Sequence, residues 1–226
     1  MGRFLSSALD KHDDRFDNPS YLALHNLPLP SASGCPYDFS RAEVQRDRLI
    51  MLVVADLLGF AVAAHDGDTD LLPMMRPTER IVTKRCSLGL LVLRPVMVRQ
   101  GLQVAGAADH PIDLARELCA RVELGQSAEE TRILAATLLT VSTIHDENMF
   151  VRVLRAYEAT FTVIAAQLRA AITALSRSDA AHATRALRCA EGSLKQVLPL
   201  FSLVATMQPG AFMAFREYTD GASAIQ

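Results

Sequence analysis

Apolar residues recur at intervals of three and four over most of the chain, which is the spacing of an amphipathic α-helix. The clearest stretch begins after His145 and carries Phe150, Val153, Leu154, Tyr157, Phe161, Ile164, Leu168, Ile172 and Leu175. A second stripe consists of Leu187, Leu194, Val197, Leu198, Phe201 and Val204. The alternation typical of strands is nearly absent, so the sequence predicts an all-α protein built as an antiparallel helical bundle.

Capping residues, glycines and prolines set the ends of the expected helices. Pro95 is expected to interrupt one helix and Pro199 to kink another. The helices are predicted from Ser40 to about Gly67, Thr78 to Gly101, Pro111 to Gly125, Ser127 to Val141, His145 to Leu175, Ser178 or Asp179 to Val204, and Pro209 to Phe215.

Residues 1–40 lack the helical periodicity and hold several prolines and serines. Apolar residues are scattered among them, namely Phe4, Tyr21, Leu22, Leu24 and Leu27. We therefore expect residues 1–40 to form an irregular, extended N-terminal arm that lies on a partner surface such as a second subunit. Residues 41–226 form the helical domain in this interpretation.

Composition narrows the classes of partner. The chain has 226 residues, a net charge of -2 and a mean hydropathy of +0.17. A balanced charge argues against a nucleic acid as partner, and the high hydropathy together with the arm favours a homodimer. The apolar run from Leu49 to Ala64 is short for a membrane span and contains Asp56, so we expect a buried helix and no membrane.

Cysteine usage and the N-terminal residues indicate a cytoplasmic protein. No secretory signal is recognisable at the start of the sequence. The four cysteines are far apart and form no C-x-x-C pair, which is typical of reduced thiols. They are Cys35, Cys86, Cys119 and Cys189.

Charged residues offer few candidates for chemistry on their own. Asp146, in His145-Asp146-Glu147, is expected to cap a helix or to occupy its first turn. His182 and Cys189 share a helix face but lack further ligands, so no metal ligand is assigned within residues 1–226 and no catalytic residue is named. A basic stretch is expected to form a solvated or subunit-contact face; it comprises Arg76, Arg80, Lys84, Arg85, Arg94 and Arg99.

Two segments, read together, resemble a known superfamily. IHDENMFVRVLRAYEATF (144–161) resembles the segment of tryptophan 2,3-dioxygenases that begins I-H-D-E-x-x-F. MQPGAFMAFREYTDGASAIQ (207–226) is similar to their M-x-x-x-x-F-x-x-F-R-x-Y-x-x-x-A-S-G-F-Q. The resemblance covers residues 144–226 and implies a helical bundle of the tryptophan 2,3-dioxygenase type with a haem cofactor.

The resemblance also implies roles for four residues. Arg216 would hold the carboxylate of an amino-acid substrate in a bidentate pair. Phe212 would contact the substrate ring, and Phe150 would line the aromatic pocket. Ser223 would lie near the haem edge and the amino group of the substrate. A planar guanidinium suits a carboxylate, and apolar rings suit an aromatic side chain.

Departures from the pattern point to one branch of the superfamily. Leu154 stands where the dioxygenases carry a distal histidine, and Ala224 replaces the glycine of A-S-G. The chain is thus more similar to the bacterial haem-dependent hydroxylases of tyrosine and 3-methyl-L-tyrosine that serve antibiotic biosynthesis. The expected reaction is hydroxylation of an L-tyrosine-type substrate, ortho to the phenol, with oxygen or peroxide. A tryptophan-type haem dioxygenase and a haem-less helical scaffold or partner subunit are the alternatives.

The iron ligand of the superfamily lies beyond the second motif. We therefore expect this chain to stop before the haem-ligand segment, and a covalent haem link would come from residues after Gln226. None of the histidines present matches the family's ligand; they are His12, His25, His65, His110, His145 and His182.

Overall fold

The structure is a computed structural model that describes residues 2–13, 15–31, 39–102, 110–137 and 139–219. Within these ranges it contains helices and one isolated bridge between Met74 and Ile144, so the predicted all-α class is confirmed. The elements are α1 (Gly2–His12), α2 (Asn18–Tyr21), the 3-10 helix η1 (Leu24–Asn26), α3 (Ser40–Asp66), α4 (Glu79–Gln100), α5 (Pro111–Leu124), α6 (Ala128–Thr137), α7 (His145–Ser176), α8 (Ala180–Val204) and α9 (Pro209–Thr219).

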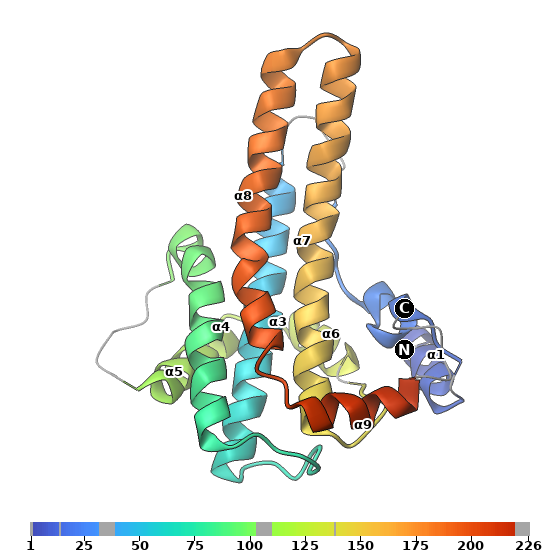
Figure 1. Cartoon of the computed structure of the whole chain (residues 1–226), viewed down its shortest axis with the longest axis vertical. Helices are drawn as coiled ribbons and strands as arrows, with labels where there is room; N and C mark the ends of the chain where they lie inside the picture. The colour runs from blue at the N-terminus through green and yellow to red at the C-terminus, as the bar shows by residue number, and fades with distance from the viewer. Residues whose placement is uncertain (1, 14, 32–38, 103–109, 138, 220–226) are drawn as a thin grey trace.

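The long antiparallel pair of α7 and α8 dominates the molecule (Figure 1). Helix α3 packs against α7 behind this pair, and α4 and α5 lie on one side. Helix α9 crosses the lower end, and the N-terminal segment lies on the other side (Figure 1). The main core is centred on α3, because this helix is apolar around most of its circumference and is covered by α4, α5 and α7.

Most predicted helix ends are confirmed. Gly67 and Gly101 end α3 and α4 in the left-handed conformation, which glycine adopts without steric cost. Helix α4 continues through Pro95, so the predicted interruption is wrong; proline removes one backbone donor, and packing on both sides holds the helix. Helix α6 ends at Thr137, earlier than predicted.

The N-terminal arm is not extended as predicted. It folds into α1, α2 and η1, and the Asp17 side chain caps α2 by accepting from the Ser20 backbone N–H. Phe16, Tyr21 and Leu22 are at most 5% exposed, packed on residues of α7 and α9 of the same chain. Of the apolar residues that suggested a partner surface, Tyr21, Leu22 and Leu27 are therefore buried within the same chain.

Two helices have the length and composition of membrane spans. These are α3 and α7, and 67% and 44% of their most apolar windows are buried inside the protein. Helices α8 and α9 would pass the same test as one broken span bent by 99°. The stretch from Leu49 to Ala64 lies in the buried part of α3, as predicted.

Many residues of the apolar stripes that the sequence placed in a core are exposed along the α7–α8 hairpin. These residues are 43–67% exposed, and the tip of the hairpin projects beyond α4 and α9. We call them the hairpin face, and they are Phe161, Leu168, Ile172, Leu175, Leu187, Leu194, Leu198 and Phe201. The buried positions here are mainly small, such as Ala166, Ala170 and Ala186.

Candidate functional site

The structure brings together the aromatic residues that the motifs singled out. The Phe150 ring from α7 lies 6.2 Å from the Phe212 ring and 5.4 Å from the Phe215 ring, centroid to centroid, and both partners belong to α9. Phe212 and Phe215 meet edge to face at 5.4 Å. These arrangements are favourable for aromatic pairs. We call Phe150, Phe212 and Phe215 the aromatic cluster; it joins segments that are distant in the sequence.

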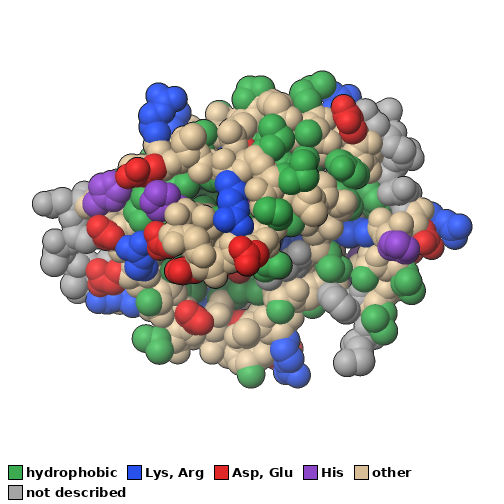
Figure 2. Space-filling view, turned by 90° about the horizontal axis from the view of Figure 1, so that it is seen from below, with side chains coloured by type: hydrophobic (Ala, Val, Ile, Leu, Met, Phe, Trp, Pro, Cys, Tyr) green, Lys and Arg blue, Asp and Glu red, His purple; other side chains and the backbone are tan. Residues whose placement is uncertain are grey.

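Arg216 lies beside this cluster on the exposed side of α9. It comes four residues after Phe212, so the two side chains leave the helix on the same face. Arg216 is exposed. Its neighbours Met213 and Tyr218 are 57% and 55% exposed, and hydrophobic side chains reach the surface at this lower end of the molecule (Figure 2). Ser223 lies outside the described residues.

A buried ion pair fixes α9 across the start of α7. Arg85 of α4 donates from Nη2 to Asp146 Oδ1 at 2.7 Å, and both side chains are fully buried. Asp146 Oδ2 accepts from the backbone N–H of Gln208, directly before α9, at 2.8 Å. Arg85 also donates from Nε to Thr206 Oγ1 at 3.0 Å and from Nη2 to the Thr206 carbonyl at 3.2 Å. The α8–α9 corner is thus held on α4 and α7.

Electrostatics around Asp146 favour its ionised form. Burial alone would raise the pKa of this carboxyl. The nearby His145 ring, whose Nδ1 is 3.9 Å from Oδ1, together with the Arg85 charge and the Gln208 N–H, outweighs burial and lowers the pKa. Asp146 therefore acts as more than the first-turn acid that the sequence suggested.

Arg85 corrects the expectation of a solvated basic face, because its side chain is fully buried. The signal was present in the sequence. Arg85 lies three residues after Val82 and four before Gly89, on the same side of α4 as the buried Val92 and Val96. A charge on the apolar face of a helix requires a buried partner of opposite charge.

Glu147 anchors the N-terminal segment to the start of α7. Its carboxylate accepts from the backbone N–H groups of Val141 and Ser142 at 2.7 and 2.9 Å, and from the Tyr21 hydroxyl at 3.2 Å. Burial raises the pKa of Glu147 despite these donors. The acidic motif residues Asp146 and Glu147 are therefore structural ties that set the positions of neighbouring elements.

Two further arginines of α7 are buried, which the sequence did not indicate. Arg152 donates from Nε to Asp56 of α3. Arg155 donates to the carbonyl groups of Leu22, at 2.9 Å, and Thr137. Burial, followed by the charge of Arg152, lowers the pKa of Arg155 to about 9. These bonds connect α7 with α3, the N-terminal segment and the end of α6.

Leu154 occupies the place of the distal histidine in the motif. It follows Phe150 by one helical turn and packs against both the main core and the cluster at α9. Its side chain is half-buried and offers no proton acceptor. The surroundings of the aromatic cluster on α7 are therefore apolar at this position.

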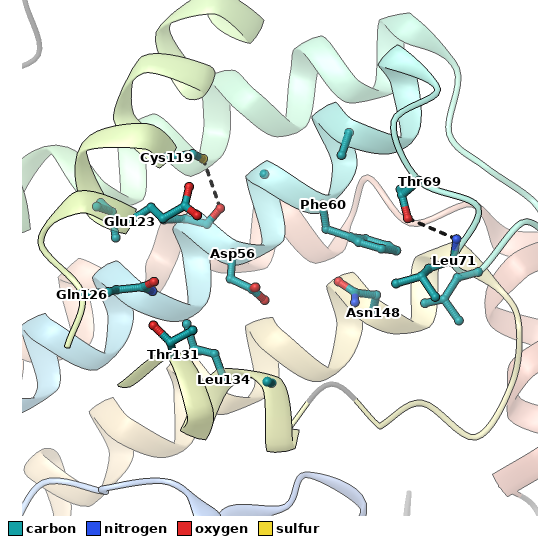
Figure 3. Close-up of a pocket in the computed structure, with 16 residues that line it drawn as sticks. Asp56, Phe60, Thr69, Leu71, Cys119, Glu123, Gln126, Thr131, Leu134 and Asn148 are labelled. Atoms are coloured by element: carbon teal, nitrogen blue, oxygen red, sulfur yellow. Dashed lines mark hydrogen bonds between the residues drawn. The ribbon is translucent and has the colours of Figure 1, made fainter. Parts of the chain in front are cut away.

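A separate pocket of about 530 Å³ opens between α3, α5, α6 and α7 (Figure 3). Asp56 and Phe60 of α3 and Asn148 of α7 lie in its inner wall, and Glu123 of α5 lies at its edge. The Phe60 ring stacks on the buried His145 ring, 4.8 Å between centroids. Sequence reasoning missed this pocket because its walls come from four helices.

Metal-ligating groups do not gather in the described part of the chain. No group of three or more His, Cys, Asp or Glu residues that could hold a metal ion occurs there. The described cysteines are free thiols, and burial raises the pKa of both Cys86 and Cys119 to about 12. His182 interacts with Asp179, which caps α8.

Comparison with known proteins finds no family model, no curated protein and no solved structure that matches the chain. The rings of Phe150 and Phe212 come together from α7 and α9, which Asp146 ties to each other, and Arg216 follows Phe212 by one helical turn.

Proposed function

We propose that the chain binds an L-tyrosine-type amino acid, such as 3-methyl-L-tyrosine, between α7 and α9 and belongs to a haem-dependent ring hydroxylase. The observation that supports this proposal is the aromatic cluster beside Arg216. The reaction would replace the ring hydrogen ortho to the phenol by a hydroxyl group. Peroxide would supply the oxygen atom and release water, or dioxygen would do so together with two electrons and two protons from an external reductant. This proposal includes membership of the tryptophan 2,3-dioxygenase superfamily and its type of helical bundle.

The binding chemistry follows from the residue types. Arg216 presents a planar fork of donors that matches a carboxylate in a bidentate pair. Phe212 and Phe150 provide faces and edges for a substrate ring. In the dioxygenases that the motif resembles, a distal histidine accepts the proton of the indole N–H. Leu154 stands at this position and cannot accept a proton, which favours hydroxylation of a phenol ring over dioxygenation of an indole.

The described residues fit the amino-acid side of such a site. Haem supplies the oxygen-activating chemistry when it is bound. The described cluster around Phe150 contributes no histidine, and the buried His145 stacks on Phe60 instead. The role of this chain's own residues is thus to bind the substrate, orient its ring and exclude water around it.

A binding experiment tests the substrate assignment. Isothermal titration calorimetry would compare L-tyrosine and 3-methyl-L-tyrosine with tyramine, which lacks the carboxylate. Arg216→Ala should weaken binding of both amino acids by about 10- to 100-fold, the worth of a charge-assisted hydrogen bond, and leave tyramine unaffected. Arg132→Ala, at an exposed position of α6, is the control. Unchanged amino-acid affinity in Arg216→Ala would exclude this role.

The haem part has its own test. The purified protein would be examined for a Soret band and by the pyridine haemochrome assay, where a shifted α-band indicates a thioether link. Tyrosine should gain one oxygen atom in the mass spectrum of the product, whereas ring-opened product from tryptophan would support the dioxygenase alternative. Absence of a Soret band after haem is supplied to a product that includes any residues encoded after Gln226 would favour the haem-less scaffold.

For the assembly, we propose a cytoplasmic homodimer that buries the hairpin face. The exposed residues repeat at i, i+7, i+11 and i+14 on both helices: Phe161, Leu168, Ile172 and Leu175 on α7, and Leu187, Leu194, Leu198 and Phe201 on α8. Each stripe therefore runs straight along its helix for about 21 Å. Tyr157 contacts both Phe161 and Phe201, so the stripes lie side by side.

The area of the hairpin face suits a second copy. Its eight residues are 43–67% exposed, and a large apolar side chain presents about 200 Å², so the face offers roughly 800 Å². A specific interface buries about 800 Å² per partner. A two-fold axis through the face would join two hairpins into a four-helix bundle.

Light scattering after gel filtration tests the dimer. Ile172→Glu together with Leu198→Glu should convert a dimer into a monomer, because each buried carboxylate would lose its hydration without a partner. Leu124→Glu, at an exposed residue outside the hairpin face, should stay dimeric. A parent protein that is monomeric at micromolar concentration would refute the proposal. If this monomer binds lipid vesicles, the hairpin face would be assigned to contact with a membrane surface.

A further inference from the structure

The pocket between α3, α5, α6 and α7 has the size and lining of a small-molecule site. Its volume of about 530 Å³ lies in the range of ligand pockets. Most of its wall is apolar, with Phe60, Leu71, Leu72 and Leu134 among the lining residues. None of the residues of the aromatic cluster lines it, so it is distinct from the proposed amino-acid site.

Asn148 gives the pocket an unsatisfied acceptor. The residue is 2% exposed, and its Oδ1 has no hydrogen-bond partner in the described structure. Figure 3 shows the amide at the pocket wall beneath the Phe60 ring, directed into the cavity. A buried acceptor without a donor is costly, so a ligand that donates a hydrogen bond here gains more than it would at an exposed amide.

Asp56 provides a second acceptor in the same wall. Arg152 donates to its Oδ2, and the Asp56 side chain keeps 23% of its surface exposed. Figure 3 shows the carboxyl group pointing into the cavity on the same side as Asn148. A carboxylate has about four acceptor positions, so Asp56 can accept from a ligand while it is paired with Arg152.

The charges around the pocket select against anions. The charged groups among the described lining residues are the carboxylates of Asp56 and Glu123. Arg152 and Arg155, which interact with Asp56, are not among the described lining residues. The Phe60 ring adds an aromatic face, which attracts cations through its quadrupole.

We propose that this pocket binds a small organic cation: a primary ammonium group carried on an aromatic or aliphatic body. The ammonium donates to Asn148 Oδ1 and to the Asp56 carboxylate, and the apolar body packs on Phe60 and the leucines of the wall. The site requires neither haem nor Arg216. Its test is therefore independent of the proposed ring hydroxylation.

Three probes of equal body size separate the charge requirement from simple hydrophobic binding. Calorimetry would titrate the protein as produced with 2-phenylethylamine, 2-phenylethanol and 3-phenylpropionate. The amine should bind with a Kd on the order of 1 mM or tighter, the alcohol at least fivefold more weakly, and the acid not measurably. Equal affinity for the amine and the acid, or no binding of the amine, would overturn the proposal.

Variants locate the binding. Ala135→Trp fills the pocket from an exposed position of α6 and should abolish amine binding, whereas Ala181→Trp, the same change at the exposed start of α8, should leave it unaltered. Asn148→Leu keeps the side-chain volume and removes the acceptor, so the amine should bind about tenfold more weakly. Amine binding that survives Ala135→Trp would place the ligand elsewhere and refute the site. Circular dichroism confirms that each variant is folded.

Discussion

Removing the Asp146 carboxylate should cost the protein a large part of its stability. Asp146→Ala leaves the Arg85 guanidinium without its counter-charge in a fully buried place, and it leaves the Gln208 N–H without an acceptor. Breaking a buried pair by removing one partner costs about 3–5 kcal/mol, and folded domains have about 5–15 kcal/mol in total. We therefore expect a loss of about 4 kcal/mol in the free energy of unfolding.

Guanidinium unfolding followed by circular dichroism would measure this loss, with the slope checked for constancy. The double variant Arg85→Met with Asp146→Leu replaces both charges by apolar groups and should lie within about 1–2 kcal/mol of the parent. Asp113→Ala removes an exposed pair with Arg116 and should change stability by less than about 0.5 kcal/mol. Both are controls for the role of burial.

A second readout links the pair to the proposed amino-acid site. The double variant restores stability but not the acceptor that holds the Gln208 N–H before α9. Tyrosine binding should therefore stay weaker than in the parent, although the protein is folded. If Asp146→Ala unfolds within 1 kcal/mol of the parent, the pair is not buried and the reasoning fails. If the double variant binds tyrosine normally, Asp146 does not position α9.

Three further changes test packing and charge. Gly89→Ala should destabilise by about 1–2 kcal/mol, because its Cβ would lie 2.8 Å from the methyl groups of the fully buried Leu58. Gly192→Ala has open space around the added Cβ, so it should raise the free energy of unfolding by about 0.5–1 kcal/mol. If denaturant unfolding shows the same effect for both glycine variants, the close packing of Gly89 on Leu58 is contradicted. Burial lowers the pKa of Lys11 to about 8, so the folded state binds fewer protons and stability should rise from pH 8 to 10.5, by up to about 3 kcal/mol. In Lys11→Met the free energy of unfolding should no longer rise over this pH range. If it rises as steeply as in the parent protein, other groups cause the pH dependence.

The sequence predicts the helices well because their signals are local. Gly67 and Gly101 end α3 and α4 where their positive φ angles are needed, and Asp179 caps α8 through its own side chain. The N-terminal segment was predicted wrongly as extended. Its short helices depend on a surface at α7 and α9 that covers Tyr21 and Leu22, and such a surface is not visible in local periodicity.

The candidate site could be predicted only in part. The resemblance of the two motifs singled out Phe150, Phe212 and Arg216, and the structure places the rings of Phe150 and Phe212 6.2 Å apart. The substrate site itself stays a prediction. The ties that hold them could not be predicted, because a buried charge is recognisable only with its partner. Arg85 and Asp146 are 61 residues apart and meet because α4 and α7 both pack on α3 and α8.

The hairpin face shows most clearly what periodicity can and cannot establish. The apolar spacing of α7 is continuous from Phe150 to Leu175, so it predicts one buried side along the whole helix. The first half of that side is covered by α9 and the core, whereas Ile172 and Leu175 are 67% and 59% exposed. The apolar periodicity predicts that one face of a helix is apolar. Only the tertiary structure shows whether other helices of the same chain bury that face. The described part of the chain leaves these residues exposed, and in the proposed dimer a second copy would cover them.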